Sequence, residues 1–399
     1  MTTPQRPLYF DYNATTPVDP RVLETMLPYF TEHFGNAESG AHAYGWKAKS
    51  AVENARKQVA ALINADASEV VFTSGSTESV MLATLGFLEG QEPKRHLITT
   101  RAEHKCTLDV CAKAEKLGHE VTYIPVNRYG QVSAADIVAA LRPNTALVTL
   151  MHANNEIGSL NPIAEIGALL RSRGIAFHVD AAQTIGKHPI DVKAMNIDLL
   201  SVSAHKYYGP KGIGALYVRR SAIHIAPLMK GGGQEKGLRG GTHNVPGIVG
   251  LGKASEIARL EMDEERTRLE KFRDKIIARF ATLPGVELNG HPTERLCNNI
   301  HVSFRGLGAD DLLLGTRDLA FSTASACSGG AMSHVLGAVG VTNPDPLFAT
   351  ARFSLGRFTT EAEVDTLIER ITAVVQNAQG VSSSYASSGV AVPNTSEIC

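Results

Sequence analysis

Polar residues follow several buried, strand-like segments of this sequence at the point where each segment ends. Thr73–Ser79 comes after one such segment and opens a helical stretch, so its small residues, hydroxyls and free helix N–H groups suit a phosphate. The same pattern is common in turns that only start a helix. Asp180 ends another segment, where its carboxylate could keep a pyridine nitrogen protonated or could simply cap a following helix. Together these residues indicate a phosphorylated, nitrogen-containing ligand only if they meet at one site.

Two further residues in such positions could carry covalent and proton-transfer chemistry. Lys206 lies just past the apolar run Leu199–Ser203, and a lysine whose pKa is lowered by burial can form a Schiff base with an aldehyde cofactor. A lysine in a solvated loop is the alternative, although the flanking Ser, His and Gly-Pro residues leave little of an ordinary solvated face. His104 follows the run that ends at Thr100, where its ring could stack on a planar cofactor and transfer protons, or be structural.

The elements that must position these residues alternate between strands and helices from about residue 47 to residue 220. Short, continuous apolar strands between helical patterns predict an α/β fold with a mostly parallel sheet that is covered on both faces. Ligands of such sheets bind at the carboxyl ends of the strands, so we expect the candidate residues to meet there. The predicted strands are Val70–Thr73, His96–Thr100, Val121–Val126, Ala146–Met151, Ile175–Asp180, Leu199–Ser203 and Ile213–Val218.

The chain beyond this sheet predicts a second, smaller unit. A long charged helix from about Val245 to Ala281 leaves the sheet, and a strand-like stretch, Asn299–Phe304, follows it. A capping box of Thr360 and Glu363 begins a closing helix that is expected to end near residue 377. We therefore expect a large domain over residues 15–260, a smaller α+β domain over residues 1–14 and 261–379, and a Ser-rich flexible tail over residues 380–399.

The bulk composition excludes several classes of function. The 399 residues carry a formal net charge of −1, so no overall basic field attracts nucleic acid or an anionic membrane. No apolar run reaches the roughly 18 residues that span a bilayer, and the short polar lead from Met1 to Pro7 argues against a signal or transit peptide. Five scattered cysteines without a Cys-x-x-Cys pair indicate free thiols in a reducing compartment, by default the cytoplasm, and no metal site.

The ordered set of motifs resembles the class V aminotransferase family and, within it, the cysteine desulfurases of the NifS/IscS type. The similarity runs from about Leu8 to about Ala378 and therefore covers nearly the whole chain. The segments that carry it are Tyr9–Pro17, Thr73–Ser79, Ala102–His104, Ala153–Gly158, His178–Gln183, Ser203–Lys206 and Arg352–Phe358.

This resemblance implies the fold type I of pyridoxal 5′-phosphate (PLP) dependent transferases, with a seven-stranded sheet in the large domain and PLP as the cofactor. It assigns Lys206 to the covalent link with the cofactor, Asp180 to the pyridine nitrogen and Gln183 to the ring hydroxyl. It also implies a homodimer, because in this family a threonine of the neighbouring subunit contacts the phosphate, and Thr242 matches it. The residues that would hold the phosphate from within the subunit are Ser76, Thr77, Ser203 and His205.

The resemblance further implies a reaction in which Cys327 takes the sulfur from L-cysteine. L-alanine would leave, and the persulfide on Cys327 would pass to a protein sulfur acceptor, in iron–sulfur cluster assembly or in tRNA or cofactor thiolation. Asn155 and Arg352 would bind the substrate, since a guanidinium suits a carboxylate, and His104 would donate a proton. Without the resemblance, Cys327 would be read as an inert, buried thiol, and Cys106, Cys111 and Cys297 are interpreted as structural.

Three alternatives keep this fold but change the function. A selenocysteine lyase would keep the cofactor and change the substrate, and an aminotransferase would need a keto acid but not Cys327. A non-catalytic partner protein on an aminotransferase fold would need none of the reactive residues. The tail that ends at Cys399 differs from the segment with which some desulfurases dock their iron–sulfur scaffold, so the sequence leaves the sulfur acceptor open.

Overall fold

The inner strands of the larger sheet are buried on both faces, as their continuous apolar sequences predict, whereas the edge strand at residues 120–124 is mostly half-buried. The structure is a computed structural model that describes residues 6–89, 93–323, 333–342 and 345–388, with side chains up to residue 378. The seven strands occur in the order β2 (Val70–Thr73), β8 (Gly214–Val218), β7 (Leu199–Ser203), β6 (Ala176–Asp180), β5 (Thr145–Met151), β3 (His96–Thr100) and β4 (Glu120–Ile124). All neighbours are parallel except β8, which is antiparallel to both β2 and β7, so the predicted mostly parallel sheet is confirmed.

Alternate residues along these strands pack into two separate cores, because successive side chains of a strand point to opposite faces. On β3, for example, Leu97 packs in one core and Ile98 in the other. The core around Leu97 is covered by α4 (Ser76–Met81), its continuation η2 (Leu82–Gly86) and α5 (Lys105–Lys116). The core around Ile98 is covered by α3 (Ala43–Leu62), α6 (Ala134–Ala140), α7 (Ile163–Ser172) and the first part of α8 (Val245–Phe280).

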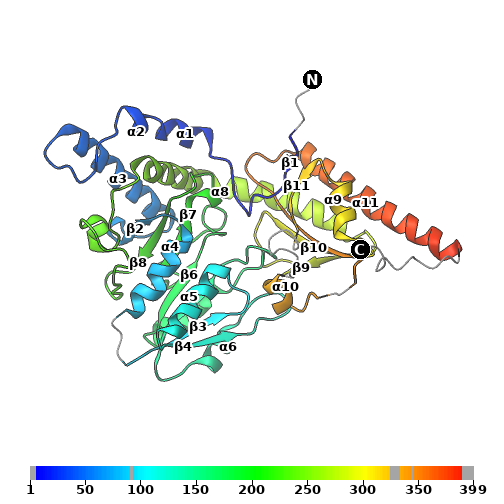
Figure 1. Cartoon of the computed structure of the whole chain (residues 1–399), viewed down its shortest axis with the longest axis horizontal. Helices are drawn as coiled ribbons and strands as arrows, with labels where there is room; N and C mark the ends of the chain where they lie inside the picture. The colour runs from blue at the N-terminus through cyan, green and yellow to red at the C-terminus, as the bar shows by residue number, and fades with distance from the viewer. Residues whose placement is uncertain (1–5, 90–92, 324–332, 343–344, 389–399) are drawn as a thin grey trace, which may run out of the picture.

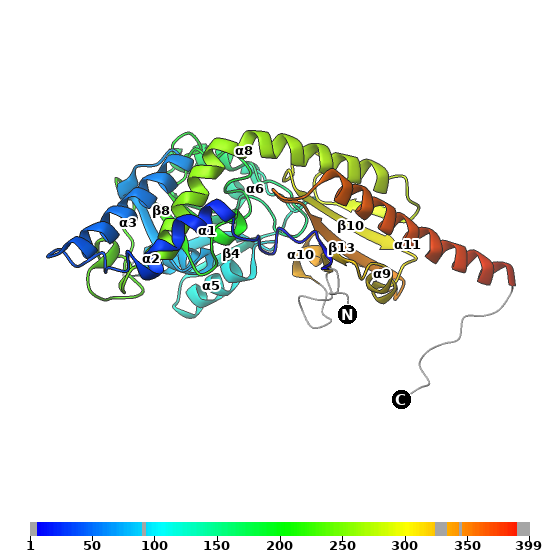
Figure 2. The ribbon, with the colours of Figure 1, turned by 90° about the horizontal axis from the view of Figure 1, so that it is seen from above.

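The smaller unit contains an antiparallel sheet of β12 (Ser322–Thr323), β13 (Phe348–Ser354), β10 (Asn299–Arg305) and β9 (Val286–Asn289). Helix α8 runs from the large sheet to this small sheet, as Figure 2 shows. The last part of α8 packs with α11 (Glu361–Ser388) on the small sheet, through residues such as Ile276 and Leu367. The remaining helices of the unit are α9 (Ala309–Gly315) and α10 (His334–Ala338).

The first strand of the chain pairs with a strand of the small unit. Strand β1 (Leu8–Tyr9) pairs in parallel with β11 (Leu319–Ala320), whereas α1 (Pro20–Met26) and α2 (Pro28–Thr31) lie with α3 on the large unit (Figure 1). This pairing supports the proposal that residues 1–14 and 261–379 form one domain, with its boundary inside α8. The segment between β1 and α1 therefore crosses from one unit to the other.

The closing helix is longer than the sequence predicts. Helix α11 begins with the expected capping box, in which Thr360 Oγ1 and its N–H donate to Glu363, but it ends at Ser388 rather than near Asn377. The prediction rests on the apolar spacing from Val364 to Val375, which stops there. Local backbone hydrogen bonds propagate a helix past its buried face, and one glycine, here Gly380, costs a helix only about 1 kcal/mol.

None of the helices in the described part of the chain combines the length and the apolar character that a membrane crossing requires.

Candidate active site

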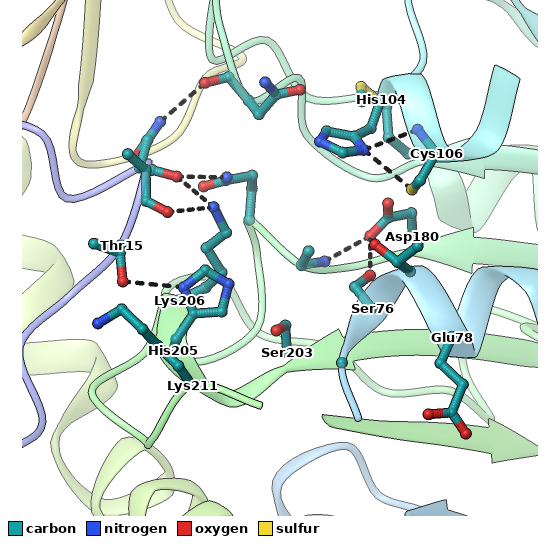
Figure 3. A pocket seen from close by; sticks show the side chains of 18 of the residues that line it. Thr15, Ser76, Glu78, His104, Cys106, Asp180, Ser203, His205, Lys206 and Lys211 are labelled. Atoms are coloured by element: carbon teal, nitrogen blue, oxygen red, sulfur yellow. Dashed lines mark hydrogen bonds between the residues drawn. The ribbon is translucent and has the colours of Figure 1, made fainter. Parts of the chain in front are cut away.

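A cavity of about 630 Å³ opens at the carboxyl ends of the central strands, between the large sheet and the small one. All but two of the residues that the sequence analysis assigns to the site line it, and they come from segments far apart in the chain. Figure 3 shows Lys206 and His205 on one side of the cavity and Asp180 with Ser76 on the other. The predicted residues that line the cavity are Ser76, Thr77, His104, Asn155, Asp180, Gln183, Ser203, His205, Lys206 and Arg352.

Lys206 lies in the short 3₁₀ turn η3 (Ala204–Lys206) that directly follows β7. Its Nζ donates to the carbonyl oxygens of Asn13 and Ala14, at 2.7 and 2.8 Å, in the segment that crosses between the two units. Burial, assisted by the positive charges of Lys187 and Arg352, lowers the pKa of Lys206 to about 8. The amine is therefore largely buried and loses its proton more readily than an exposed lysine, as covalent attachment to an aldehyde requires.

This lowered pKa predicts how the cofactor-free protein captures an aldehyde cofactor. Because only the neutral amine attacks the aldehyde, and the fraction of neutral Lys206 increases as the pH rises through about 8, the capture rate should increase up to that pH and then level off. Stopped-flow absorbance between pH 6 and about 10 checks this profile. Lys187 lies outside the cavity lining and contributes to the shift, so K187M should move the profile to higher pH. A rate that is constant or falls over this range would contradict the assignment of Lys206.

Asp180 is the last residue of β6 and is buried. Its carboxylate accepts hydrogen bonds from the N–H of Ala182 at 2.9 Å and from Ser76 Oγ at 3.3 Å. Within residues 181–198 the chain forms turns and no helix, so the interpretation of Asp180 as a helix cap is wrong. Burial raises the pKa of Asp180, although the bond from Ala182 opposes the shift. A cation such as a protonated ring nitrogen would therefore stabilise its ionised form.

His104 occupies the N-cap position of α5 and lines the cavity, so it has both a structural role and access to a ligand. Its Nδ1 accepts the backbone N–H of Cys106 at 3.2 Å, which leaves the proton of the neutral ring on Nε2. Burial lowers the pKa of His104 and favours this neutral form. The ring can therefore donate a proton through Nε2.

Cys106, which the sequence analysis interprets as structural, lies at the cavity. Its Sγ lies 3.0 Å from Nδ1 of His104 (Figure 3). Burial and the nearby charge of Asp180 raise the pKa of this thiol to about 12, so it stays protonated near neutral pH. The sequence contains one signal for this position: Cys106 lies two residues after His104, in the first turn of a helix that starts at the site. Cys111 and Cys297 are free, buried thiols, in agreement with the interpretation.

The N-terminus of α4 lies at the cavity. Ser76 and Thr77 are the first residues of α4, where backbone N–H groups have no partner inside the helix. The turn before them packs closely on β8, because a Cβ on Gly214 would lie only 2.7 Å from Cα of Gly75. Burial, with the charge of Lys206, lowers the pKa of His205 to about 4, so its neutral ring can offer a hydrogen bond. Lys211, which the sequence analysis did not select, adds a positive charge at this cavity.

Arg352 extends from β13 of the small sheet into the opposite end of the cavity. Its Nη1 donates to the carbonyl oxygen of Asn155 at 2.9 Å, and its Nη2 donates to Oδ1 of Asp11 at 2.8 Å. Ser322, whose Cα is paired in register with that of Arg352, donates to the same Asp11 oxygen at 2.9 Å. Asp11 is another residue that the sequence analysis missed, although it lies in the quoted segment Tyr9–Pro17.

Several buried polar atoms of the cavity residues find no hydrogen-bond partner within the described residues. They are Nε of Arg352, Oδ1 of Asn155 and Oε1 of Gln183. Gln183 uses its Nε2 to donate to the Asn13 carbonyl at 3.0 Å, so its free oxygen is left to accept from a hydroxyl. Buried polar atoms are normally paired, so these atoms fit a polar ligand that supplies a carboxylate and a hydroxyl group. With Lys206, Asp180 and the α4 N-terminus, they fit a phosphorylated pyridine aldehyde together with an amino acid.

Of the two remaining predicted residues, one lies away from the cavity of its own subunit and the other lies outside the described residues. Thr242 is exposed and lies in the segment between the turn η4 (Gln234–Gly237) and α8, so the structure does not bring it to the cavity of its own subunit. Cys327 lies outside the described residues. The chain enters its segment beside Arg352, at β12, and leaves it at Ser333, whose Oγ donates to Oε2 of Glu156 at 2.6 Å. Both ends of that segment are thus fixed beside cavity residues.

Comparisons with known proteins agree in one result. The profile of the aminotransferase class-V family matches residues 8–367. The chain is 50% identical over 384 residues to cysteine desulfurase IscS of Anaeromyxobacter dehalogenans (strain 2CP-C), with 95% of each chain covered. It is 48% identical over 370 residues to the cysteine desulfurase of Homo sapiens, which covers 92% of this chain and 81% of the human protein.

Solved structures give the same result for the fold. A NifS-like protein superposes with a TM-score of 0.86 at 38% identity, over 93% of this chain and 99% of that chain. The structure of SspA in complex with cysteine superposes with a TM-score of 0.78 at 41% identity, over 88% of this chain and 100% of that chain. The seven-stranded sheet with its smaller antiparallel sheet is therefore the fold of NifS-like proteins.

Proposed function

Since the chain belongs to the class V aminotransferase family and is a PLP-dependent cysteine desulfurase, we propose that the cavity around Lys206 is where it removes sulfur from L-cysteine. The observation that carries this proposal is that Lys206, Asp180 and Arg352 line one cavity although three separate elements supply them. An amine, an acid and a guanidinium in this arrangement correspond to the aldehyde, the ring nitrogen and the substrate carboxylate.

Residues of the large sheet would hold the cofactor. Lys206 would bind it covalently, Asp180 would keep its ring nitrogen protonated, and the free Oε1 of Gln183 would accept from its hydroxyl. When bound, the protonated ring withdraws the electron pair that remains when Cα of the substrate loses its proton. The phosphate would lie at the α4 N-terminus with the side chains of Ser76, Thr77, Ser203 and His205.

Residues from both units would bind the substrate and move its protons. Arg352 would bind the carboxylate of cysteine through its unpaired Nε and one Nη. The free Oδ1 of Asn155 would accept a hydrogen bond from a donor group of the substrate. Lys206, as a neutral amine, would take the Cα proton because its pKa is lowered. His104 would donate a proton from Nε2, because its Nδ1 is occupied by the N–H of Cys106.

Cys327 would accept the sulfur. Its thiolate would form an S–S bond with the substrate sulfur while the Cβ–S bond of the substrate breaks. The electron pair of that bond would remain with the substrate carbon skeleton, which leaves as L-alanine after a proton returns. The described chain before Cys327 ends in β12, where Ser322 is paired with Arg352. A protein sulfur acceptor would then take the sulfur from the persulfide.

The proposed subunit arrangement is a homodimer, and an exposed apolar surface supports it. Phe30 on α2, Phe34 between α2 and α3, and Trp46 on α3 are 58%, 64% and 58% exposed. Large exposed apolar residues that gather on one face indicate a protein interface. Glu38, in the same region, lies 3.6 Å from His243, which directly follows Thr242, so this face adjoins the proposed phosphate contact.

The free thiols of Cys106, Cys111 and Cys297 support a reducing, cytoplasmic location.

Mass spectrometry tests the proposed reaction directly. After treatment of the enzyme with L-cysteine, we expect the peptide that carries Cys327 to gain the mass of one sulfur atom, while L-alanine appears in solution. The peptides with the buried residues Cys111 and Cys297 provide the internal control and should keep their mass. Sulfur on one of these peptides, or alanine release without any persulfide, would contradict the role of Cys327.

A further inference from the structure

A buried carboxylate outside the cavity lining accepts four hydrogen bonds. The side chain of Glu235 is only 1% exposed, and it accepts from Nη1 and Nη2 of Arg56 at 2.7 and 2.9 Å. Its other donors are Nε2 of His243 at 2.7 Å and the backbone N–H of Phe72 at 2.9 Å. Although burial opposes ionisation, the bonds from Arg56 and His243 hold the pKa of Glu235 at about 2. The carboxylate is therefore ionised and fully engaged.

The backbone at Glu235 is strained. Glu235 and Lys236 have φ angles of +51° and +58°, in the left-handed region that residues with a Cβ avoid. Two adjacent residues persist in this conformation only where their surroundings impose it. The four hydrogen bonds of the Glu235 side chain provide that constraint, so the path of the chain after η4 depends on this carboxylate.

The chain that Glu235 constrains is the loop that leads to Thr242. His243, one of the donors to Glu235, directly follows Thr242, so the loop is attached on both sides of this threonine. Inside the loop, the N–H of Gly241 donates to Oε1 of Gln234 at 3.0 Å. Arg239 provides a further attachment, because its Nε donates to Oε1 of Glu78 at 3.0 Å. Thr242 is thus exposed on a loop whose position is fixed.

The same contacts reach the phosphate-binding turn of the subunit. Phe72 lies on β2, which leads into that turn, and the guanidinium of Arg56 lies 4.7 Å from the centre of its ring. Glu78, the partner of Arg239, belongs to α4 and accepts the N–H of Ser74 at 2.7 Å. Two sets of charged side chains, Arg56–Glu235–His243 and Arg239–Glu78, therefore join the phosphate turn of a subunit to the loop that carries its Thr242.

We propose that Glu235 is a positioning residue that fixes Thr242 for the neighbouring subunit, so that cofactor retention in one subunit depends on Glu235 of the other. This inference rests on the proposed function, specifically on the dimer in which Thr242 contacts the phosphate of the neighbour. Glu235 does not line the cavity and would act on the phosphate of the neighbouring subunit through Thr242.

A second buried carboxylate of the same construction serves as the matched control. Asp198 accepts from Arg171 at 3.1 Å, from Arg219 at 2.6 Å and from the N–H of Phe177, on β6, at 2.9 Å. Its side chain is 3% exposed, but it lies at the amino end of β7, away from both the phosphate turn and the Thr242 loop. D198N should therefore lower stability much as E235Q does, without releasing cofactor.

Mixed dimers separate the effect on the neighbour from the effect within the subunit. In the first dimer, one chain carries both K206A and E235Q and the other chain is wild type. The wild-type chain then holds the intact Lys206 site, and its neighbour supplies the Thr242 loop that E235Q alters. In the second dimer, K206A and E235Q are on different chains, so the chain with the intact Lys206 site receives an unaltered Thr242 loop from its neighbour. We expect cofactor release, followed by visible absorbance, to be about tenfold faster in the first dimer, the effect of one charge-assisted hydrogen bond.

The remaining variants decide whether Glu235 acts through Thr242. E235Q should add little to the release rate of a T242A chain, because both changes remove the same contact. If E235Q prevents folding, R239A provides the second variant, because Arg239 is partly exposed and its loss leaves no buried cation. With R239A in place of E235Q, cofactor release should again accelerate in the first arrangement only. Equal release rates in the two arrangements, an equal effect of D198N, or full additivity with T242A would overturn the proposal.

These outcomes distinguish the inference from the function on which it rests. Normal release by T242A, with wild-type turnover intact, would reject the Thr242 contact and this inference but leave the desulfurase reaction in place. A fully active monomer would reject the dimer and the inference together. Loss of turnover in variants that retain cofactor would mean that Glu235 acts on the chemistry, which also contradicts the inference.

Discussion

Replacing Lys206 with alanine should abolish the covalent retention of PLP and lower the rate of alanine release from L-cysteine by about 10³-fold or more. The reason is that one amine has two tasks: it holds the cofactor and it moves the Cα proton. Its burial and its pKa of about 8 suit both tasks, and in the described part of the chain its Nζ donates to two backbone carbonyls, which carry no charge. Absorbance of the purified variant and an alanine assay measure the two losses separately.

Lys187 provides the matched control for this variant. It is also a buried lysine, its pKa is also lowered to about 8, and its Nζ donates only to the carbonyl of Gln183 at 3.2 Å, but it does not line the cavity. K187M should therefore keep the covalent cofactor and most of the turnover. Thermal unfolding of both variants checks that the protein remains folded. Turnover by K206A at the rate of the wild type would show that the proposed chemistry is wrong.

Cys327→Ala should reduce turnover of L-cysteine to background while cofactor binding stays normal. The variant has no thiolate that can accept the substrate sulfur, although Lys206 and Arg352 can still bind cofactor and substrate. Because selenium leaves more readily than sulfur, the same variant should still release alanine from L-selenocysteine. Parallel alanine assays with both substrates, on wild type and variant, test this difference.

Cys106 provides the control for the C327A variant, since it is the thiol that lines the cavity in the described part of the chain. Its pKa of about 12 keeps it protonated, so C106A should retain most of the turnover of L-cysteine. If C106A were inactive and C327A active, the nucleophile would be Cys106. A wild-type protein that released alanine from L-selenocysteine alone would instead be a selenocysteine lyase.

Local patterns in the sequence predicted most of the fold. The strands Val70–Thr73, His96–Thr100 and Leu199–Ser203 have the predicted bounds, and the other strands of the large sheet differ by one or two residues at one or both ends. The inner strands are buried on both faces, so their apolar residues are continuous and bounded by polar turns. The end of α11 was not predictable in this way, because apolar spacing reports the buried face of a helix and not its length.

The position of the site also followed from the sequence, but the roles of its residues did not. The carboxyl ends of parallel strands lie at one edge of a sheet, so His104, Asp180 and Lys206 were expected to meet, and they line one cavity. Each of these residues alone had an ordinary structural interpretation. Their assignment to PLP and to cysteine came from the family resemblance, which the comparisons confirm at the level of the family and its reaction.

Only the tertiary structure decided which charges pair across the chain. Arg352 bonds Asp11 although 341 residues separate them, and Arg56 bonds Glu235 across 179 residues. It also decided that Cys106 lies against His104 at the cavity and that Thr242 is exposed away from it. The sequence by itself determined the elements and the edge where ligands bind, because local hydrogen bonding and burial patterns repeat along a chain. The pairing of distant charges depends on how whole elements pack, and no local pattern records that packing.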